Sequence, residues 1–351
     1  MDNRIPVTLL TGFLGSGKTT LLNKLLNHEG MKDTAVVINE LGSTGLDHIL
    51  SKHLERTVES QHIADNTVLL ESGCLCCTLT NEMADTLRDL FFKRALGAIP
   101  EFKRLIIETT GLADPIPIMG SLLNEPVIGS TYRLDAVVVT VDSIYGIEQI
   151  AQHQEAKKQV AVADVLLLTK TDLASTEQIK NLQNALLELN ASASQFHIKH
   201  GNIEPASIID VGLFNAEKQA TPQRWLKTPN KPKGLLDTNH NGGIKSFTVT
   251  LPSPLSYDQL EAKLEWLCEH HGEQLLRMKG ILHVDDDDDM SPRDDRVHIQ
   301  DQPRQRHLYL LQSICDVFEI KRSCIEEGSP DDRSGGENRF IVIGRRLDKD
   351  S

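Results

Sequence analysis

The sequence predicts an α/β protein: a doubly wound, mostly parallel sheet followed by a small α+β domain. Strands and helices alternate over the first two hundred residues, and this pattern changes beyond residue 201. The predicted strands are short β-branched or Leu-rich runs without polar alternation, at residues 7–10, 35–38, 105–107, 136–141 and 165–168. Such runs are typical of parallel strands buried on both faces.

Amphipathic helical patterns separate these strands. Apolar side chains recur every three or four residues in two stretches, at Met83, Leu87, Leu90 and Phe91 and at Ile179, Leu182, Leu186 and Leu189. Ser175 and Gln178 have the spacing of a capping box, which predicts the start of the second helix. Strand–helix alternation of this kind indicates a doubly wound domain, which we expect over residues 1–215.

A second unit follows a segment rich in Pro, Asn, Lys and Gly, which we interpret as a linker over residues 216–243. An alternating strand is predicted at 245–251 and a helix at about 257–271. Shorter strands are predicted at 281–284, 308–312 and 340–343. These elements predict an α+β domain over residues 244–351.

The composition argues against two classes of partner. Lys and Arg number 37 against 50 Asp and Glu, and this net charge of −13 is poorly suited to a nucleic-acid backbone. Apolar runs stay well below the ~18 residues of a membrane span, and the N-terminus has no features of a secretory signal. We therefore expect a cytoplasmic protein. The five consecutive Asp at 285–289 fit a solvated loop, with a weak cation site including His283 as the alternative.

Residues 12–19 fit the phosphate-loop motif G-x-x-x-x-G-K-[ST]. A predicted strand precedes them and a Leu-rich helix follows, as this motif requires. The glycines let backbone N–H groups turn inward around an anion, and the helix N-terminus adds partial positive charge. Lys18 is expected to reach the β and γ phosphates and the Thr19 hydroxyl to bind Mg²⁺. The motif predicts a nucleoside triphosphate site.

Residues 169–172 indicate which nucleotide base is bound. Their sequence, Thr-Lys-Thr-Asp, is a variant of the N-K-x-D guanine loop. The carboxylate of Asp172 can accept from N1–H and the 2-amino group of guanine. Adenine offers neither donor, and an unpaired carboxylate costs about 1–3 kcal/mol or more. Lys170 would lie along the base plane, while Thr169 stands where Asn is usual.

A third element is Glu108, which ends an apolar strand, with Gly111 three residues later. Phosphate-loop enzymes hold Mg²⁺ or its water shell with a carboxylate at such a position, and the glycine N–H can face the γ-phosphate. A simple polar strand end is the alternative for Glu108.

Three thiols lie within four residues, at Cys74, Cys76 and Cys77. They can converge on one soft cation, and zinc takes about four such ligands. Glu40 is one candidate for the fourth ligand. Buried reduced cysteines or a redox pair are the alternatives. The other cysteines, Cys268, Cys315 and Cys324, are scattered and are expected to be structural. The pairs His197 with His200 and His270 with His271 are expected to be surface residues, with metal binding as the alternative.

Together these motifs resemble the CobW-type metallochaperone GTPases, relatives of the nickel-insertion GTPases of hydrogenase and urease maturation. The resemblance lies in TLLTGFLGSGKTTLLN, VVINELG, ESGCLCCTL, IIETTGLADP and LLLTKTD, in this order. The segments GGIKSFTV, LLRMKGILHV and FIVIGRRLD resemble the C-terminal domain of the family.

The resemblance implies slow GTP hydrolysis to GDP and binding of zinc, cobalt or another transition metal, with nucleotide state coupled to metal delivery into a client metalloprotein. A nucleotide- or metal-dependent homodimer is a further implication. Glu108 would serve Mg²⁺ or position water, and the Gly111 N–H would face the γ-phosphate. Lys170 and Asp172 would hold guanine, and the metal would be held by Cys74, Cys76, Cys77 and Glu40. The phosphates and Mg²⁺ would be held by Gly12, Gly15, Ser16, Gly17, Lys18, Thr19 and Thr20.

The sequence departs from the family pattern in three places. Ser43 follows Asn-Glu-Leu-Gly where the family often has Glu, so one potential acidic ligand is missing. His240 alone stands where many members have a histidine-rich stretch. A closing helix is expected after residue 346, and the sequence ends at Ser351.

Two other classes of protein also fit the sequence. The protein could be a phosphate-loop kinase or ligase with structural cysteines and no preference for GTP. It could also be a zinc-binding regulatory module in which GTP is only a structural ligand.

Overall fold

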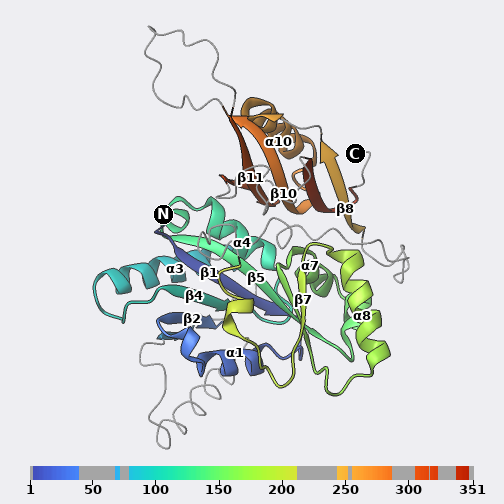
Figure 1. The fold of residues 1–351 in the computed structure, drawn as a ribbon. Coiled ribbons are helices and arrows are strands. Elements are labelled where there is room, and N and C mark those ends of the chain that lie inside the picture. Colours follow the sequence, from blue (N-terminus) through green and yellow to red (C-terminus); the bar gives the residue numbers. More distant parts are fainter. Residues whose placement is uncertain are drawn as a thin grey trace, which may run out of the picture.

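The computed structural model describes residues 3–38, 68–71, 79–211, 243–251, 255–286, 305–315, 317–322 and 337–347. These residues form two sheets, one in each half of the chain, and Figure 1 shows the C-terminal sheet lying above helices α4 and α7 of the first half. The predicted fold, a parallel doubly wound sheet followed by a smaller α+β unit, is confirmed.

The first sheet has seven strands in the order β3-β2-β4-β1-β5-β6-β7, and every neighbouring pair is parallel. Its strands are β1 (Ile5–Gly12), β2 (Thr34–Ile38), β3 (Val68–Glu71), β4 (Arg104–Glu108), β5 (Tyr132–Asp142), β6 (Val165–Thr169) and β7 (Ser194–His197). Strand β1 is central: β2, β3 and β4 lie on one side of it, and β5, β6 and β7, which follow in the chain, lie on the other. The carboxyl ends of β1 and β4 thus lie at the point where strand order reverses, which is where open α/β sheets bind ligands.

Helices cover both faces of this sheet. They are α1 (Lys18–Leu26), α3 (Leu79–Ala95), α4 (Pro115–Asn124), α5 (Pro126–Thr131), α6 (Gly146–Gln152), α7 (Gln154–Val162) and α8 (Thr176–Leu189), with short 3-10 turns η1 (Glu29–Met31) and η2 (Pro205–Ser207). Consecutive strand residues enter opposite cores: Leu9 packs with the α3, α4, α7 and α8 side, and Leu10 packs with the α1 side. Burial on both faces explains why the strands lack polar alternation.

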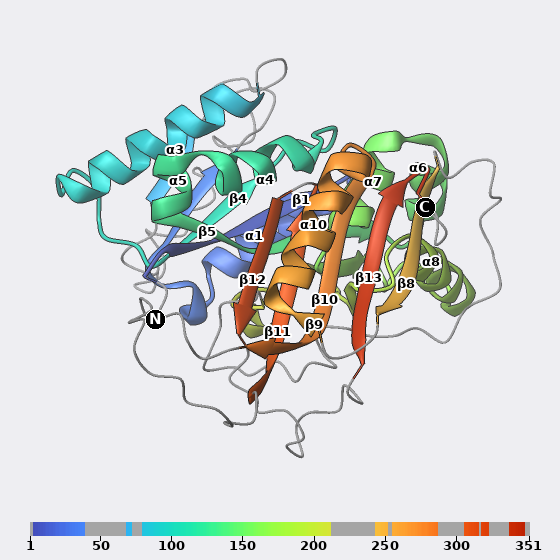
Figure 2. The same cartoon turned by 90° about the horizontal axis from the view of Figure 1, so that it is seen from above.

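The second sheet is mixed. Its strands are β8 (Ile244–Leu251), β9 (Leu255–Ser256), β10 (Leu275–Asp286), β11 (Gln305–Ile314), β12 (Val317–Arg322) and β13 (Asn338–Arg345). They follow the order β12-β11-β10-β13-β8 with antiparallel neighbours, and β9 pairs in parallel with β10. Helix α10 (Tyr257–His271) packs on one face and begins with a capping box of Ser256 and Gln259. Figure 2 shows α10 above β10 and β11, with β13 and β8 to one side of it.

The other face of this sheet packs on the first domain. Ile341 and Ile343 of β13 belong to the same hydrophobic core as the α4 and α7 side of the first sheet. Buried charges also cross the interface: the Asp164 carboxylate lies 2.6 Å from both Arg277 and Lys279 of β10. Burial alone would raise the pKa of Asp164, but these two cations outweigh it and hold that pKa below its ordinary value.

Among the described residues, helices are too short or too polar to cross a membrane.

Candidate nucleotide and metal site

The turn between β1 and α1 depends on glycine. Gly12, Gly15 and Gly17 have φ values of 142°, 72° and 97°, which favour glycine. A Cβ on Gly12 would lie 2.3 Å from Thr140 Oγ1, so a larger residue does not fit there. A Cβ on Gly15 would meet no atom within 4 Å, so this part of the loop faces open space. The loop thus has the shape of an anion cradle.

The α1 N-terminus adds donors to this cradle. Its N-cap residue, Gly17, supplies no side-chain cap to the first turn, where Thr20 is exposed. Lys18 lies over the loop and donates from Nζ to the Gly12 carbonyl oxygen at 2.7 Å. Uncapped N–H groups, the helix dipole and an ammonium fit a phosphate chain. Ser16 is buried and its hydroxyl lies 2.7 Å from Thr140 Oγ1, so this side chain supports the loop from inside.

Two oxygen-bearing side chains meet beside the loop. Thr19 Oγ1 donates to Glu108 Oε1 at 3.4 Å, and Glu108 is only 5% exposed at the end of β4. Hydroxyl and carboxylate oxygens are the ligands that Mg²⁺ prefers. The donor set of Thr19 and Glu108 therefore fits a magnesium ion next to the phosphates.

The segment after β4 touches the phosphate loop directly. A Cβ on Gly111 would lie 2.6 Å from the backbone N of Leu14, so only glycine allows this approach. The buried Gln159 of α7 holds the segment from the other side, because its Nε2 donates to the Gly111 and Ala113 carbonyl oxygens at 3.2 and 3.0 Å. Because Gly111 lies against the phosphate loop, a shift of that loop would move the Gly111 segment as well.

The predicted base loop is joined to the phosphate loop. Thr169 Oγ1 donates to the Ser16 carbonyl oxygen at 2.8 Å, so threonine supplies this link in the position where Asn is usual. Lys170 has a positive φ of 55° and its Nζ lies 2.5 Å from Asp142 Oδ2. Asp172 is about a quarter exposed, and its carboxylate lies 3.8 Å from His200 Nε2. This partly exposed carboxylate can accept hydrogen bonds at this edge of the sheet.

Several of these residues were not predicted from the sequence. Thr140, Asp142, Gln159 and His200 belong to no local motif, and the fold brings them to the site from β5, α7 and the segment after β7. Gln159 lies on an amphipathic helix where a polar residue gives no signal of its own.

The predicted metal ligands Glu40, Cys74, Cys76 and Cys77 lie outside the described residues, as does most of the expected linker. The strands that precede them, β2 and β3, are parallel neighbours that end at the same edge as β1 and β4. Within the described ranges, groups of three or more His, Cys, Asp or Glu side chains suited to a metal ion are absent.

The doubly wound sheet and the glycine cradle at its switch point define a P-loop nucleotide-binding protein. More narrowly, the chain belongs to the CobW/HypB/UreG family: residues 6–197 match its nucleotide-binding domain, and residues 244–351 match the cobalamin synthesis protein cobW C-terminal domain. The resemblance inferred from the motifs is thereby confirmed.

Named relatives and a solved structure resemble most of the chain. The zinc chaperone YjiA of Escherichia coli is 37% identical over 81% of this chain and 83% of its own length. The zinc-regulated GTPase metalloprotein activator 1 of Schizosaccharomyces pombe is 28% identical over 90% of this chain and 76% of its own. The crystal structure of Zn(II)-bound YjiA GTPase from E. coli superposes with a TM-score of 0.70 at 28% identity, covering 99% of this chain and 96% of that one.

Proposed function

We propose that the protein is a GTP-hydrolysing metal chaperone. It binds zinc, or a similar transition metal, through Cys74, Cys76 and Cys77 with Glu40, and couples its nucleotide state to transfer of the metal into a client metalloprotein. The observation that carries the proposal is the direct contact of Gly111 with the phosphate loop in a chain whose relatives are named zinc chaperones and GTPases. For this function we propose a GTPase domain of residues 1–215 and a C-terminal α+β domain of residues 244–351, joined by a linker of residues 216–243.

The nucleotide would be held by its two ends. The N–H groups of the loop from Gly12 to Gly17, the Lys18 ammonium and the first turn of α1 with Thr20 would bind the phosphates. Asp172 would accept from the guanine edge, and the alkyl stem of Lys170 would lie against the base while Asp142 fixes its ammonium. This arrangement favours GTP over ATP because adenine would leave the carboxylate without donors.

Hydrolysis would use water as the nucleophile. The water oxygen would attack the γ-phosphorus, the bond to the oxygen bridging the β and γ phosphates would break, and GDP, phosphate and the proton lost by the water would result. Bound Mg²⁺, held by Thr19 and through Glu108, would neutralise charge on the phosphates. The Gly111 N–H would face the γ-phosphate. The described site brings no arginine to the phosphate loop, which supports slow turnover by the protein alone.

The metal is the cargo of this scheme. Thiolates favour zinc and other soft cations over Mg²⁺. Because β2 and β3 end beside β1 and β4, a γ-phosphate that orders the Gly111 segment can also alter the geometry offered to the metal. Loss of that phosphate would then relax the site and release the ion.

A second copy of the chain is the proposed dimer partner. Large apolar side chains stand exposed in the loops that follow four adjacent strands, with exposures of 48–67% for Leu14, Leu112, Tyr145 and Leu173. Apolar side chains gathered at one edge mark an interaction surface. This surface borders the nucleotide site, so its shape would follow the nucleotide state.

The deciding experiment is a chelator competition for zinc on the whole protein loaded with Mg-GDP or with a non-hydrolysable GTP analogue. A difference in zinc affinity of tenfold or more, about 1.4 kcal/mol of coupling, is the expected result. The control is the triple variant Cys74→Ala, Cys76→Ala, Cys77→Ala, which should lose zinc and keep GTP binding. Equal zinc affinities in both states would indicate a structural zinc and refute the chaperone function.

A further inference from the structure

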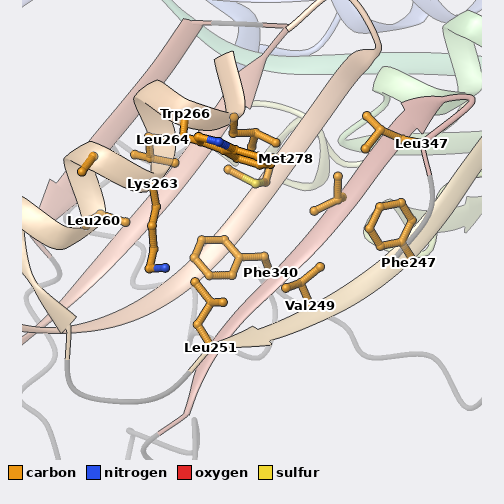
Figure 3. Close-up of a pocket in the computed structure, with 13 residues that line it drawn as sticks. Phe247, Val249, Leu251, Leu260, Lys263, Leu264, Trp266, Met278, Phe340 and Leu347 are labelled. Atoms are coloured by element: carbon orange, nitrogen blue, oxygen red, sulfur yellow. The ribbon is translucent and has the colours of Figure 1, made fainter. Parts of the chain in front are cut away.

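An apolar groove of about 500 Å³ lies on the C-terminal domain, between α10 and the strands β13 and β8. Figure 3 shows Leu264 and Trp266 on the helix side and Phe247, Val249 and Phe340 on the strand side. The groove is on the face of the sheet opposite the first domain, so it is separate from the nucleotide site.

The strand side of this groove is apolar and only partly covered. Phe247, Val249 and Leu251 alternate along β8 on one face, and each is half-buried. Trp266, at the helix lip, is 49% exposed. An apolar sheet face is normally covered by a second layer, and α10 covers β10 and β11 while β13 and β8 lie beside it (Figure 2). Among the described elements, this face of β13 and β8 lacks a second layer.

The size of the open face matches one helix. Neighbouring strands are about 4.8 Å apart, so two strands and the sheet edge span roughly the 10–12 Å diameter of a helix with its side chains. An extended strand could pair with the outer edge of β8, but it would lie beside the sheet and leave the volume above β13 unfilled. The groove favours a helix.

The charge of the groove lining indicates which kind of helix would bind there. Of its lining residues, all within the described part of the chain, Lys263 alone is charged, and Figure 3 shows its side chain running from α10 toward Phe340 and Leu251. In the described residues Lys263 has no carboxylate partner within ion-pair distance. Lys245, two residues before Phe247, shares the groove face of β8. The four carboxylates of α10 do not line the groove; they are Asp258, Glu261, Glu265 and Glu269. The charge that an occupant would meet in the groove lining is therefore positive, although the chain as a whole carries −13.

We propose that the groove binds an acidic amphipathic helix of a partner protein. Apolar side chains at positions i, i+3 or i+4, and i+7 of that helix would enter between Trp266 and Phe247. An Asp or Glu beside this apolar stripe would pair with Lys263. Docking there buries the exposed apolar strand surface and gives the Lys263 ammonium a counter-charge.

The test uses the whole protein without nucleotide or metal and a fluorescein-labelled helical peptide of about 20 residues. The peptide carries Leu at i, i+3, i+4 and i+7 and Glu at the flanking positions; its matched control has Lys in place of every Glu. The acidic peptide is expected to bind at least tenfold more tightly and to shift the emission of Trp266. Lys263→Glu should reverse the preference. Lys180→Glu, an exposed cation on α8, is the matched control and should leave it unchanged.

Other outcomes would overturn the proposal. Equal binding of the two peptides, or an acidic preference that survives Lys263→Glu, would show that Lys263 selects nothing. Val249→Asp should abolish binding; persistent binding by a folded Val249→Asp protein would place the peptide elsewhere. A dimer in sedimentation that Lys263→Glu dissolves would make a second copy the occupant, and binding to anionic vesicles in place of the peptide would make it a lipid surface. Because nucleotide and metal are absent from the assay, failure here leaves the proposed chaperone function standing.

Discussion

The side chain of Gln159 holds the carbonyl oxygen of Gly111 at 3.2 Å, from a helix that also touches the phosphate loop and the second domain. His153, the N-cap of this helix α7, stacks on Phe13 of the phosphate loop with ring centroids 4.5 Å apart. Asp164, just beyond its end, binds Arg277 of β10. One helix thus contacts the phosphate loop at its start and is followed directly by a contact with the C-terminal domain, which gives the two domains a physical connection.

Replacing Gln159 by Leu tests this connection. The variant leaves two buried carbonyl oxygens without their donor, which costs about 1–3 kcal/mol. We expect lower stability in urea and a larger loss of GTP hydrolysis than of GTP binding, because the Gly111 segment is no longer held. Gln152→Leu, an exposed position on α6, is the control and should be near neutral. Unchanged hydrolysis in a folded Gln159→Leu protein would exclude a role for this contact.

The sequence predicted the parts of the fold that local patterns encode. Continuous apolar runs located five strands, and the capping box of Ser175 and Gln178 is present as predicted. The edge strand β7 has the sequence Ser-Gln-Phe-His and is half-buried, so it shows no apolar run. Strand β10 begins six residues before its predicted start, because Arg277 and Lys279 break the apolar pattern. Their burial depends on Asp164, more than a hundred residues away.

The same distinction applies to the site. The phosphate loop is one contiguous motif, so the sequence alone predicts its residues. The supports of that loop are dispersed: Thr140 contacts Ser16 from β5, and Gln159 reaches Gly111 from α7. Contacts of this kind exist only after the sheet has formed, so spacing along the chain carries no signal for them.

The bond from Thr169 to Ser16 is the subject of the second prediction. Thr169→Val keeps the shape of the side chain and removes the hydroxyl that bonds the Ser16 and Val141 carbonyl oxygens. We expect a loss of about 1–3 kcal/mol in stability and weaker binding of both GTP and GDP in calorimetry, because the two nucleotide loops lose their link. Thr250→Val, exposed on β8, should change neither quantity. Normal GDP affinity in Thr169→Val would mean that the link is not needed for binding.

The third prediction concerns the base. Asp172→Asn replaces a carboxylate acceptor by an amide that can donate to the 2-oxo group of xanthine. We expect GTP affinity to fall by about 10–100-fold, from a lost bond to a charged group, and XTP affinity to rise. Asp89→Asn, exposed on α3, is the matched control for the charge change. A ratio of GTP to XTP affinity that does not move would favour the kinase or ligase class, in which Asp172 has no part in base selection.

The final prediction concerns the buried charges between the domains. Asp164→Asn keeps the shape of the side chain but leaves the Arg277 and Lys279 side chains, 2% and 5% exposed, without their carboxylate. Breaking a buried ion pair from one side typically costs about 3–5 kcal/mol, and urea unfolding should show a loss of this size. Asp85→Asn, which removes an exposed partner of Arg88, should cost little.

The sign of the pH dependence follows from the same geometry. Burial opposes ionisation of Asp164, but Arg277 and Lys279 outweigh it and lower the pKa of this carboxyl in the folded state. Its contribution to the free energy of unfolding is therefore complete above the ordinary Asp pKa of about 3.9 and is lost as the pH falls through the lower folded-state pKa. In Asp164→Asn this acid-range slope should be reduced.

A triple variant with Asp164→Leu, Arg277→Met and Lys279→Met should recover much of the lost stability, because apolar packing often replaces a buried ionic cluster without cost. If the triple variant is no more stable than Asp164→Asn, the loss of stability in Asp164→Asn does not come from leaving the Arg277 and Lys279 charges buried without a counter-charge.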